Sequence, residues 1–218
     1  MTRKPHISIV VAVDKNNAIG INGVMGWSVA SDLKFFRALT LDKVVIMGRV
    51  TAQSLIEPLG RRVNVYISSK QDMAINASGF IWAPDLVAAI EYAKNNYPEK
   101  DIAIIGGQSI YEQAFDLGIG DTVWRSVLSK IVLEKADRYF PRIPESEFKL
   151  SETVTFKEFK AERYSRIEKL ARGYIAARKR GDTLETAFTR SHEVADSLDE
   201  VGYEITIIDF RPAETKNG

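Results

Sequence analysis

Short apolar runs alternate with helical patterns along most of the chain. The runs are rich in β-branched residues and bounded by glycine, serine or charged residues, a pattern typical of buried strands. They lie at residues 7–13, 43–47, 63–68, 80–83, 102–105 and 122–133, and a last antiparallel pair is expected at 148–156 and 203–210. Between them, helices are expected at 32–39, 49–55, 85–96 and 110–117. This alternation predicts an α/β fold with a mostly parallel sheet and helices on both faces.

The composition is that of an ordinary globular protein. Of the 218 residues, 45% are hydrophobic and 27% are charged, and the net charge is +1, so neither nucleic acid nor a membrane is expected as a partner. The chain has no cysteine, which excludes disulfides and a cysteine nucleophile, and no metal site is expected. The first apolar run is too short for a signal peptide or a membrane span, so we expect a cytoplasmic protein.

One acid stands out at the start of the helix expected at 32–39. Asp32 follows Ser31, which we expect to cap the helix, and the helix dipole favours an anion in this first turn. Apolar side chains also surround the acid in the sequence, namely Trp27, Leu33, Phe35 and Phe36. The pattern fits either an ordinary helix start or a carboxylate held in an apolar pocket.

Three expected strands end in residues suited to binding phosphate. These turns are Gly48-Arg49, Ser68-Ser69 and Gly106-Gly107. Glycine lets a ligand approach the backbone at a helix start, and Arg49 adds a positive charge. Such turns are common singly in α/β proteins. Because ligands bind beyond the carboxyl ends of the strands, the three together favour a phosphate-rich ligand.

The glycine-rich segment at residues 18–26 joins the first strand to the acid. Apolar residues stand between its glycines, at Ile19, Ile21, Val24 and Met25. This pattern fits a loop that packs its apolar side chains on the core. It equally fits a lid that closes over a ligand, because a lid has hinges and an apolar underside.

The motifs, taken in order, resemble those of the dihydrofolate reductase family. They are Ile19-Gly20, Met25-Gly26-Trp27, Asp32-Leu33 with Phe36, Thr40, residues 45–49 with Thr51, Ser68-Ser69, Ile105-Gly106-Gly107 with Ile110-Tyr111, and Asp137 with Tyr139-Phe140-Pro141. They run from about residue 7 to 156 and resume at Tyr203. The resemblance implies an eight-stranded, mostly parallel sheet with flanking helices. It also implies NADPH-dependent reduction of dihydrofolate to tetrahydrofolate in nucleotide biosynthesis.

The resemblance also implies a set of site residues. Asp32 matches the essential carboxylate of the family. This carboxylate holds the amino-pyrimidine edge of the pterin and favours protonation of N5 while hydride reaches C6. Trp27 and Met25 are implied as catalytic residues together with Asp32. The implied substrate contacts are Val10, Asp32, Leu33, Phe36, Arg62, which pairs with the glutamyl carboxylate, and Ser129, a hydroxyl near the acid. The implied NADPH contacts are Ala12, Ala18, Ile19, Gly20, Gly48, Arg49, Val50, Thr51, Ser68, Ser69, Ile105, Gly106, Gly107, Gln108, Ser109, Ile110 and Tyr111. The glycine pair resembles the family's cis glycine pair.

Four positions depart from the family pattern. Gly26 stands where the family usually has proline, and Val50 replaces a common polar cofactor contact. Ser109 stands where a second cation often helps to bind the 2′-phosphate, so preference for NADPH rests more heavily on Arg49. Glu57 sits where many members carry a cation near the folate tail.

Two other functions are compatible with parts of this pattern. The reductase of riboflavin biosynthesis shares the fold and uses NADPH, but it lacks the spacing of Trp27 and Asp32. A structural or scaffold protein would keep the fold and use an insertion for assembly, but the retained Asp32, Arg49 and Gly106-Gly107 argue against a loss of activity.

Residues 157–201 are expected to form an insertion within a single domain spanning residues 1–218. Apolar residues at helical spacing predict a first helix at about 158–179, and Gly181 would end it. A second helix would follow to about Glu200. The first helix is basic and the second acidic, which predicts an antiparallel hairpin that packs on the sheet, on another copy of the chain or on a protein partner.

Overall fold

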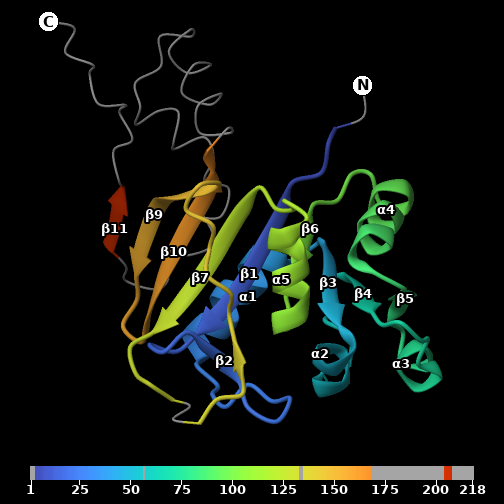
Figure 1. The fold of residues 1–218 in the computed structure, drawn as a ribbon, viewed down its shortest axis with the longest axis horizontal. Coiled ribbons are helices and arrows are strands. Elements are labelled where there is room, and N and C mark those ends of the chain that lie inside the picture. The colour runs from blue at the N-terminus through green and yellow to red at the C-terminus, as the bar shows by residue number, and fades with distance from the viewer. Residues whose placement is uncertain (1–2, 56, 133–134, 168–203, 208–218) are drawn as a thin grey trace, which may run out of the picture.

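A sheet of nine strands forms the centre of the computed structural model, which describes residues 3–55, 57–132, 135–167 and 204–207 (Figure 1). The order across the sheet is β11-β9-β10-β7-β1-β6-β3-β4-β5. Neighbours from β7 to β5 are parallel, whereas β9, β10 and β11 pair antiparallel. The strands are β1 (Ile7–Val13), β3 (Val44–Gly48), β4 (Val63–Ile67), β5 (Ile81–Ala83), β6 (Ile102–Ile104), β7 (Thr122–Leu128), β9 (Phe148–Thr155), β10 (Phe159–Arg166) and β11 (Glu204–Ile207). The mostly parallel eight-stranded sheet is confirmed, and β11 adds a ninth strand at its edge.

Helices cover both faces of this sheet. The buried residues of α4 (Leu86–Asn96) and α5 (Gln108–Asp116) belong to one hydrophobic cluster. The buried apolar residues of α1 (Ala30–Thr40), α2 (Arg49–Ser54) and α3 (Met73–Ala77) belong to a second cluster. Strand β1 divides the clusters, because Ile9 and Val11 belong to the first and Val10 to the second. Burial on both faces explains why this strand reads as an uninterrupted apolar run.

The helix caps were predicted correctly at one helix and wrongly at another. Asp85 caps α4, because its Oδ1 accepts a hydrogen bond from the Ala88 N–H at 2.8 Å. Ser31 does not cap α1, which begins after Val29 with no side-chain cap. The Ser31 hydroxyl instead donates to Glu158 Oε2 at 2.7 Å. The hydroxyl thus donates to a distant carboxylate instead of accepting from a local backbone N–H.

The glycine-rich segment combines features of both interpretations left open above. Its start forms β2 (Ala18–Gly20), which pairs with β8 (Arg138–Tyr139) in a small separate sheet. The Asn22 N–H then donates to both carboxylate oxygens of Asp137 at 3.2 Å. Further on, Val24 and Met25 are about half exposed. One end of the segment is thus packed, while the other presents apolar side chains to solvent.

The prediction of a helix at about 158–179 is wrong for residues 159–166. These residues form β10, which lies between β7 and β9 and pairs with both. Apolar residues at three-to-four spacing predicted the helix, but Phe159 and Ala161 are buried two positions apart with the exposed Lys160 between them, as on one face of a strand. Charged residues are tolerated in this strand because neighbouring strands supply partners; Arg125 Nη2, for example, lies 2.6 Å from Glu162 Oε2. Tertiary pairing has overridden local propensity.

The rest of the expected hairpin lies outside the described residues, and its helices stay a prediction. Strand β11 falls within the strand expected at 203–210 and pairs antiparallel with β9, as expected for the last pair. The expected strand at 122–133 is shorter than predicted, because β7 ends at Leu128.

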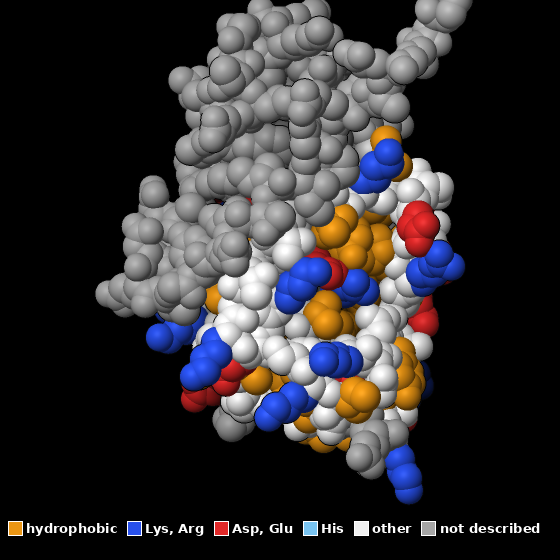
Figure 2. All heavy atoms as spheres, turned by 90° about the vertical axis from the view of Figure 1, so that its left-hand side faces the viewer, with side chains coloured by type: hydrophobic (Ala, Val, Ile, Leu, Met, Phe, Trp, Pro, Cys, Tyr) orange, Lys and Arg blue, Asp and Glu red, His pale blue; other side chains and the backbone are white. Residues whose placement is uncertain are grey.

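The surface toward the antiparallel edge carries grouped apolar side chains. Figure 2 shows them lining a hollow, with lysine or arginine side chains and acidic side chains nearby.

No helix within the described ranges is both long and apolar enough to cross a membrane.

Candidate active site

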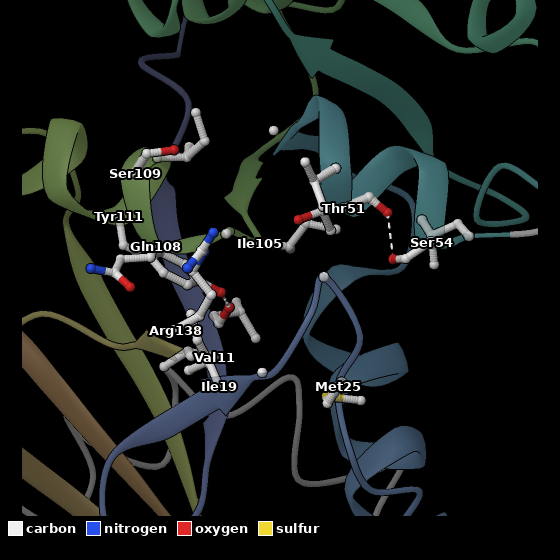
Figure 3. A pocket seen from close by; sticks show the side chains of 18 of the residues that line it. Val11, Ile19, Met25, Thr51, Ser54, Ile105, Gln108, Ser109, Tyr111 and Arg138 are labelled. Carbon is white, nitrogen blue, oxygen red and sulfur yellow. Dashed lines mark hydrogen bonds between the residues drawn. The ribbon is translucent and has the colours of Figure 1, made fainter. Parts of the chain in front are cut away.

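A cleft of about 1410 Å³ opens at the carboxyl ends of the parallel strands. In Figure 3, Ile19, Gln108, Tyr111 and Arg138 lie along one side of it and Thr51 and Ser54 along the other, with Met25 at one end. A pocket for one small ligand usually measures about 300–1,000 Å³. The cleft therefore has room for two ligands side by side.

Asp32 is the buried acid of this cleft. Helix α1 places it in its first turn, where the residue is only 4% exposed. Burial raises the pKa of the Asp32 carboxyl, and a side-chain hydrogen bond with Ser126 acts in the opposite direction. Of the two possibilities left open by the sequence, the structure favours the carboxylate in an apolar pocket.

Ser126, and not Ser129, supplies the hydroxyl beside the acid. Ser126 is buried within β7 and lines the cleft. Ser129 is exposed, lies beyond the end of the strand and donates its N–H to the Glu158 carbonyl. The prediction for Ser129 is wrong because β7 ends at Leu128. The polar pair Ser129-Lys130 follows the apolar run and could have indicated that the strand ends at Leu128.

An apolar wall and two cations extend from Asp32. Val10, Leu33 and Phe36 line the cleft as predicted. Arg62 lines it too, donating to Thr40 Oγ1 at 2.9 Å and to the Gly60 carbonyl at 3.0 Å. Burial lowers the pKa of Arg62, and the positive charge of the nearby Arg37 lowers it further. Two neighbouring cations that line the same cleft suit a ligand that ends in carboxylates.

Hydroxyl groups and Arg49 line another part of the cleft. Thr51, Ser68 and Ser69 border it with Arg49, which follows strand β3 directly. The Arg49 side chain is exposed, and across the described ranges it has no ion-pair partner within 4.0 Å. A guanidinium without a carboxylate partner, lining the same cleft as three hydroxyl groups, fits a phosphate.

The glycine turns bring backbone close to the cleft. The Gly106-Gly107 peptide bond is cis, as the resemblance implied. Gly106 has a φ of 102°, and an added Cβ would lie 2.8 Å from the Tyr111 ring. The Tyr111 hydroxyl donates to the Val10 carbonyl at 2.8 Å. Gly106 is therefore required by both its backbone conformation and its close packing.

Most of the predicted site residues line this one cleft. Besides those discussed, they are Ala12, Ile19, Gly20, Gly48, Val50, Ile105, Gly107, Gln108, Ser109 and Ile110. Trp27, Ala18, Gly106 and Ser129 are not among the lining residues. Ala18 is fully buried, and Trp27 packs on the second hydrophobic cluster with its Nε1 buried and unpaired within the described structure. Glu57 is exposed and also lies outside the lining.

Two arginines of the cleft were missed by the sequence reasoning. Arg37 stands four residues after Leu33, so the two share a helix face, and that spacing could have found it. Arg138 lies on β8, whose pairing with β2 brings it to the cleft. No local pattern indicates that pairing. In the described part of the chain no cluster of three or more His, Asp or Glu residues could hold a metal.

The chain matches known proteins along most of its length. A sequence model for a family described as "Dihydrofolate reductase" matches residues 6–191. Proteins named dihydrofolate reductase are similar too. One from Neisseria meningitidis serogroup A is 35% identical over 147 residues, which cover 67% of this chain and 85% of that protein. One from Haemophilus influenzae is 31% identical over 163 residues, which cover 74% of this chain and 92% of that protein.

The chain belongs to the dihydrofolate reductase family. A further relative, from Buchnera aphidicola of Acyrthosiphon pisum, is 39% identical over 109 residues, but these span only 64% of that protein and 50% of this chain. The family match continues through residue 191, beyond residue 156, where the matching motifs stop before they resume at Tyr203. The position of β10 accounts for part of this difference, since residues 159–166 belong to the central sheet of this dihydrofolate reductase family member.

Proposed function

We propose that the cleft binds NADPH and 7,8-dihydrofolate side by side, and that hydride passes to C6 and a proton to N5. Family membership makes the chain an oxidoreductase of one-carbon metabolism that reduces dihydrofolate to tetrahydrofolate. The proposal adds the cofactor and the roles of individual residues. It rests chiefly on one observation, the buried Asp32 carboxylate in a cleft that elsewhere carries Arg49 and several hydroxyls.

The substrate would occupy the part of the cleft around Asp32. The two carboxylate oxygens of Asp32 would accept hydrogen bonds from the amino-pyrimidine edge of the pterin. Val10, Leu33 and Phe36 would pack on the pterin rings. An ionised Asp32 in an apolar pocket stabilises positive charge nearby, which favours a proton on N5. Arg62, supported by Arg37, would pair with the carboxylates of the glutamyl tail.

The cofactor would occupy the part bordered by α2, β4 and α5. Arg49, Ser68 and Ser69 would hold the 2′-phosphate, and the backbone near Gly106-Gly107 leaves room for a close approach by the dinucleotide. When bound, NADPH supplies the hydride. Ile19 and Gly20, on the strand β2 that borders the cleft, would help to exclude water from the reacting centre.

The alternatives receive less support. The relatives compared are named dihydrofolate reductase, which favours folate over the ribosylaminopyrimidine of riboflavin synthesis. A purely structural protein has no need for a buried acid, two cations and a hydroxyl-lined turn around one cleft.

The activity is tested by the loss of NADPH absorbance when dihydrofolate is added to purified protein. We expect oxidation of NADPH that requires dihydrofolate and is blocked by methotrexate. A purified protein that binds NADPH but does not oxidise it with dihydrofolate would contradict the proposed reaction. A protein that binds neither compound would contradict the assignment of the cleft.

We also propose that the rest of the predicted 157–201 insertion, residues 168–201, mediates assembly with another copy of the chain or a protein partner, as the charge pattern suggests. The test compares the mass in solution of the full chain with that of a variant in which a short glycine-containing turn replaces residues 168–201, so that β11 is kept. An unchanged mass per particle would remove the support for self-association.

A further inference from the structure

Arg49 is held from outside the cleft by a glutamine. Arg49 Nη1 donates to Gln53 Oε1 at 3.1 Å, across one turn of α2. Gln53 is exposed and is not among the residues that line the cleft. Within the described chain, this is the one side-chain hydrogen bond of the Arg49 guanidinium. Its remaining N–H groups therefore stay available to a ligand.

Gln53 is in turn held by Asp72. Gln53 Nε2 donates to Asp72 Oδ2 at 3.3 Å. The other oxygen, Oδ1, caps α3 by accepting from the Ala74 and Ile75 N–H groups at 3.1 and 3.3 Å. The backbone of Asp72 is fixed as well, because its N–H donates to the hydroxyl of the fully buried Tyr66 at 2.8 Å. The anchor of this chain of contacts thus lies in the core.

The two contacts determine which way the glutamine amide points. Its NH₂ group faces a carboxylate and its carbonyl faces a guanidinium. The reversed amide would place a donor against Arg49 and an acceptor against Asp72, losing both hydrogen bonds. Asp72 therefore orients Gln53, and Gln53 orients Arg49.

We propose that Gln53 and Asp72 are positioning residues that hold Arg49 in place for the 2′-phosphate of the cofactor, and so set the preference for NADPH over NADH from outside the cleft. The inference rests on the proposed function, which assigns the 2′-phosphate to Arg49. An arginine loses several rotatable degrees of freedom when it binds a phosphate. A side chain already held in one orientation has less freedom left to lose, which strengthens binding.

Direct binding to Gln53 variants tests the inference without any turnover. Gln53→Leu removes the hydrogen bonds to Arg49 and Asp72 while keeping a side chain of similar size. Gln53→Glu puts a charged acceptor beside Arg49 that competes with a phosphate and is repelled by Asp72. Gln71→Leu is the matched control, because Gln71 is exposed and does not line the cleft. Dissociation constants would be measured by calorimetry for NADPH, NADH, adenosine 2′,5′-bisphosphate and adenosine 5′-phosphate, with thermal melting as a check on folding.

We expect Gln53→Leu to weaken NADPH and adenosine 2′,5′-bisphosphate by about threefold to tenfold, the range for one net hydrogen bond. Gln53→Glu should weaken them further, while NADH, adenosine 5′-phosphate and all ligands of Gln71→Leu stay within about twofold of wild type. Wild-type NADPH binding by both Gln53 variants, or equal losses for NADPH and NADH, would overturn the inference.

The failure of the proposed function has a different signature. If wild-type protein and Arg49→Ala bind NADPH equally, the 2′-phosphate is not bound by Arg49, and both the cofactor assignment and this inference fail. If Arg49→Ala loses NADPH selectively while both Gln53 variants do not, only the positioning role fails.

Discussion

Asp32 on helix α1 and Ser126 on strand β7 share a side-chain hydrogen bond inside the cleft. Burial of Asp32 disfavours its charge, and the serine hydroxyl partly compensates by favouring the carboxylate. The two effects therefore act in opposite directions on the ionisation of the acid.

Asp32→Asn should remove most turnover of dihydrofolate. The amide keeps the shape of the side chain but cannot carry the negative charge that favours a proton on N5. Loss of such a group typically costs about 10²–10⁴-fold in rate. Steady-state kinetics would measure the loss, and partial recovery at acid pH is expected if protonated substrate replaces the missing charge. NADPH affinity serves as the control and should stay at the wild-type level. Wild-type turnover at neutral pH would refute the assignment.

The same variant should be more stable than wild type near neutral pH. At a pH below the ordinary value of 3.8, the Asp32 carboxyl is protonated in folded and unfolded chains alike. Its pKa is raised on folding, so above 3.8 the folded state holds more protons and the contribution of Asp32 to stability falls as pH rises. Asn avoids this loss. Thermal melting from about pH 4 to 7 should show a growing advantage for Asp32→Asn; an advantage that shrinks over this range would contradict the desolvation of Asp32.

Ser126→Ala should shift the pH profile of catalysis, and Ser129→Ala should not. Without the Ser126 hydroxyl the pKa of Asp32 rises further, so less carboxylate is present at neutral pH. The limb of the kcat/KM profile that reports Asp32 should move to higher pH, with a fall of about tenfold or less at neutral pH. The exposed Ser129 provides a control of the same residue type. A shift caused by Ser129→Ala alone would restore the original prediction for that residue.

Arg49→Ala should weaken NADPH by about tenfold or more, because it removes a charge-assisted hydrogen bond to phosphate. NADH has no 2′-phosphate, so its dissociation constant should change much less. Calorimetric titration of both cofactors measures the difference. Arg61→Ala is a suitable control, since Arg61 pairs with Asp42 on the surface. Equal losses for both cofactors would show that Arg49 contacts a part that they share.

Phe159→Ala should destabilise the protein by about 3–5 kcal/mol, the usual cost of emptying a buried aromatic site. Phe159 is 1% exposed and stacks on Phe156 with ring centroids 4.3 Å apart. Denaturant unfolding would measure the loss, and Lys157→Ala, at an exposed neighbour, should stay within about 0.5 kcal/mol of wild type. A small effect of Phe159→Ala would favour the original view of this segment as an appended helix.

The sequence by itself determined the parallel half of the sheet, the cap on α4 and the glycine and serine turns that border the cleft. Buried parallel strands are continuous apolar runs, and Asp85 is followed by helical spacing, so both signals are local. The predicted residues from Asp32 to Tyr111, except Gly106, line one cleft because the carboxyl ends of parallel strands meet at one edge of the sheet.

Only the tertiary structure decided the place of β10 in the antiparallel half and the partners around the acid. Strand β10 reads as a helix locally, and its charged residues become acceptable only beside partners such as Arg125 on β7. Ser126 replaced Ser129 because the end of a strand is set by its neighbours. Ser31 and Gln53 each found partners far along the chain, Glu158 and Asp72. Hydrogen bonds and ion pairs between distant segments leave no periodic trace in a sequence, because their energy depends on three-dimensional proximity.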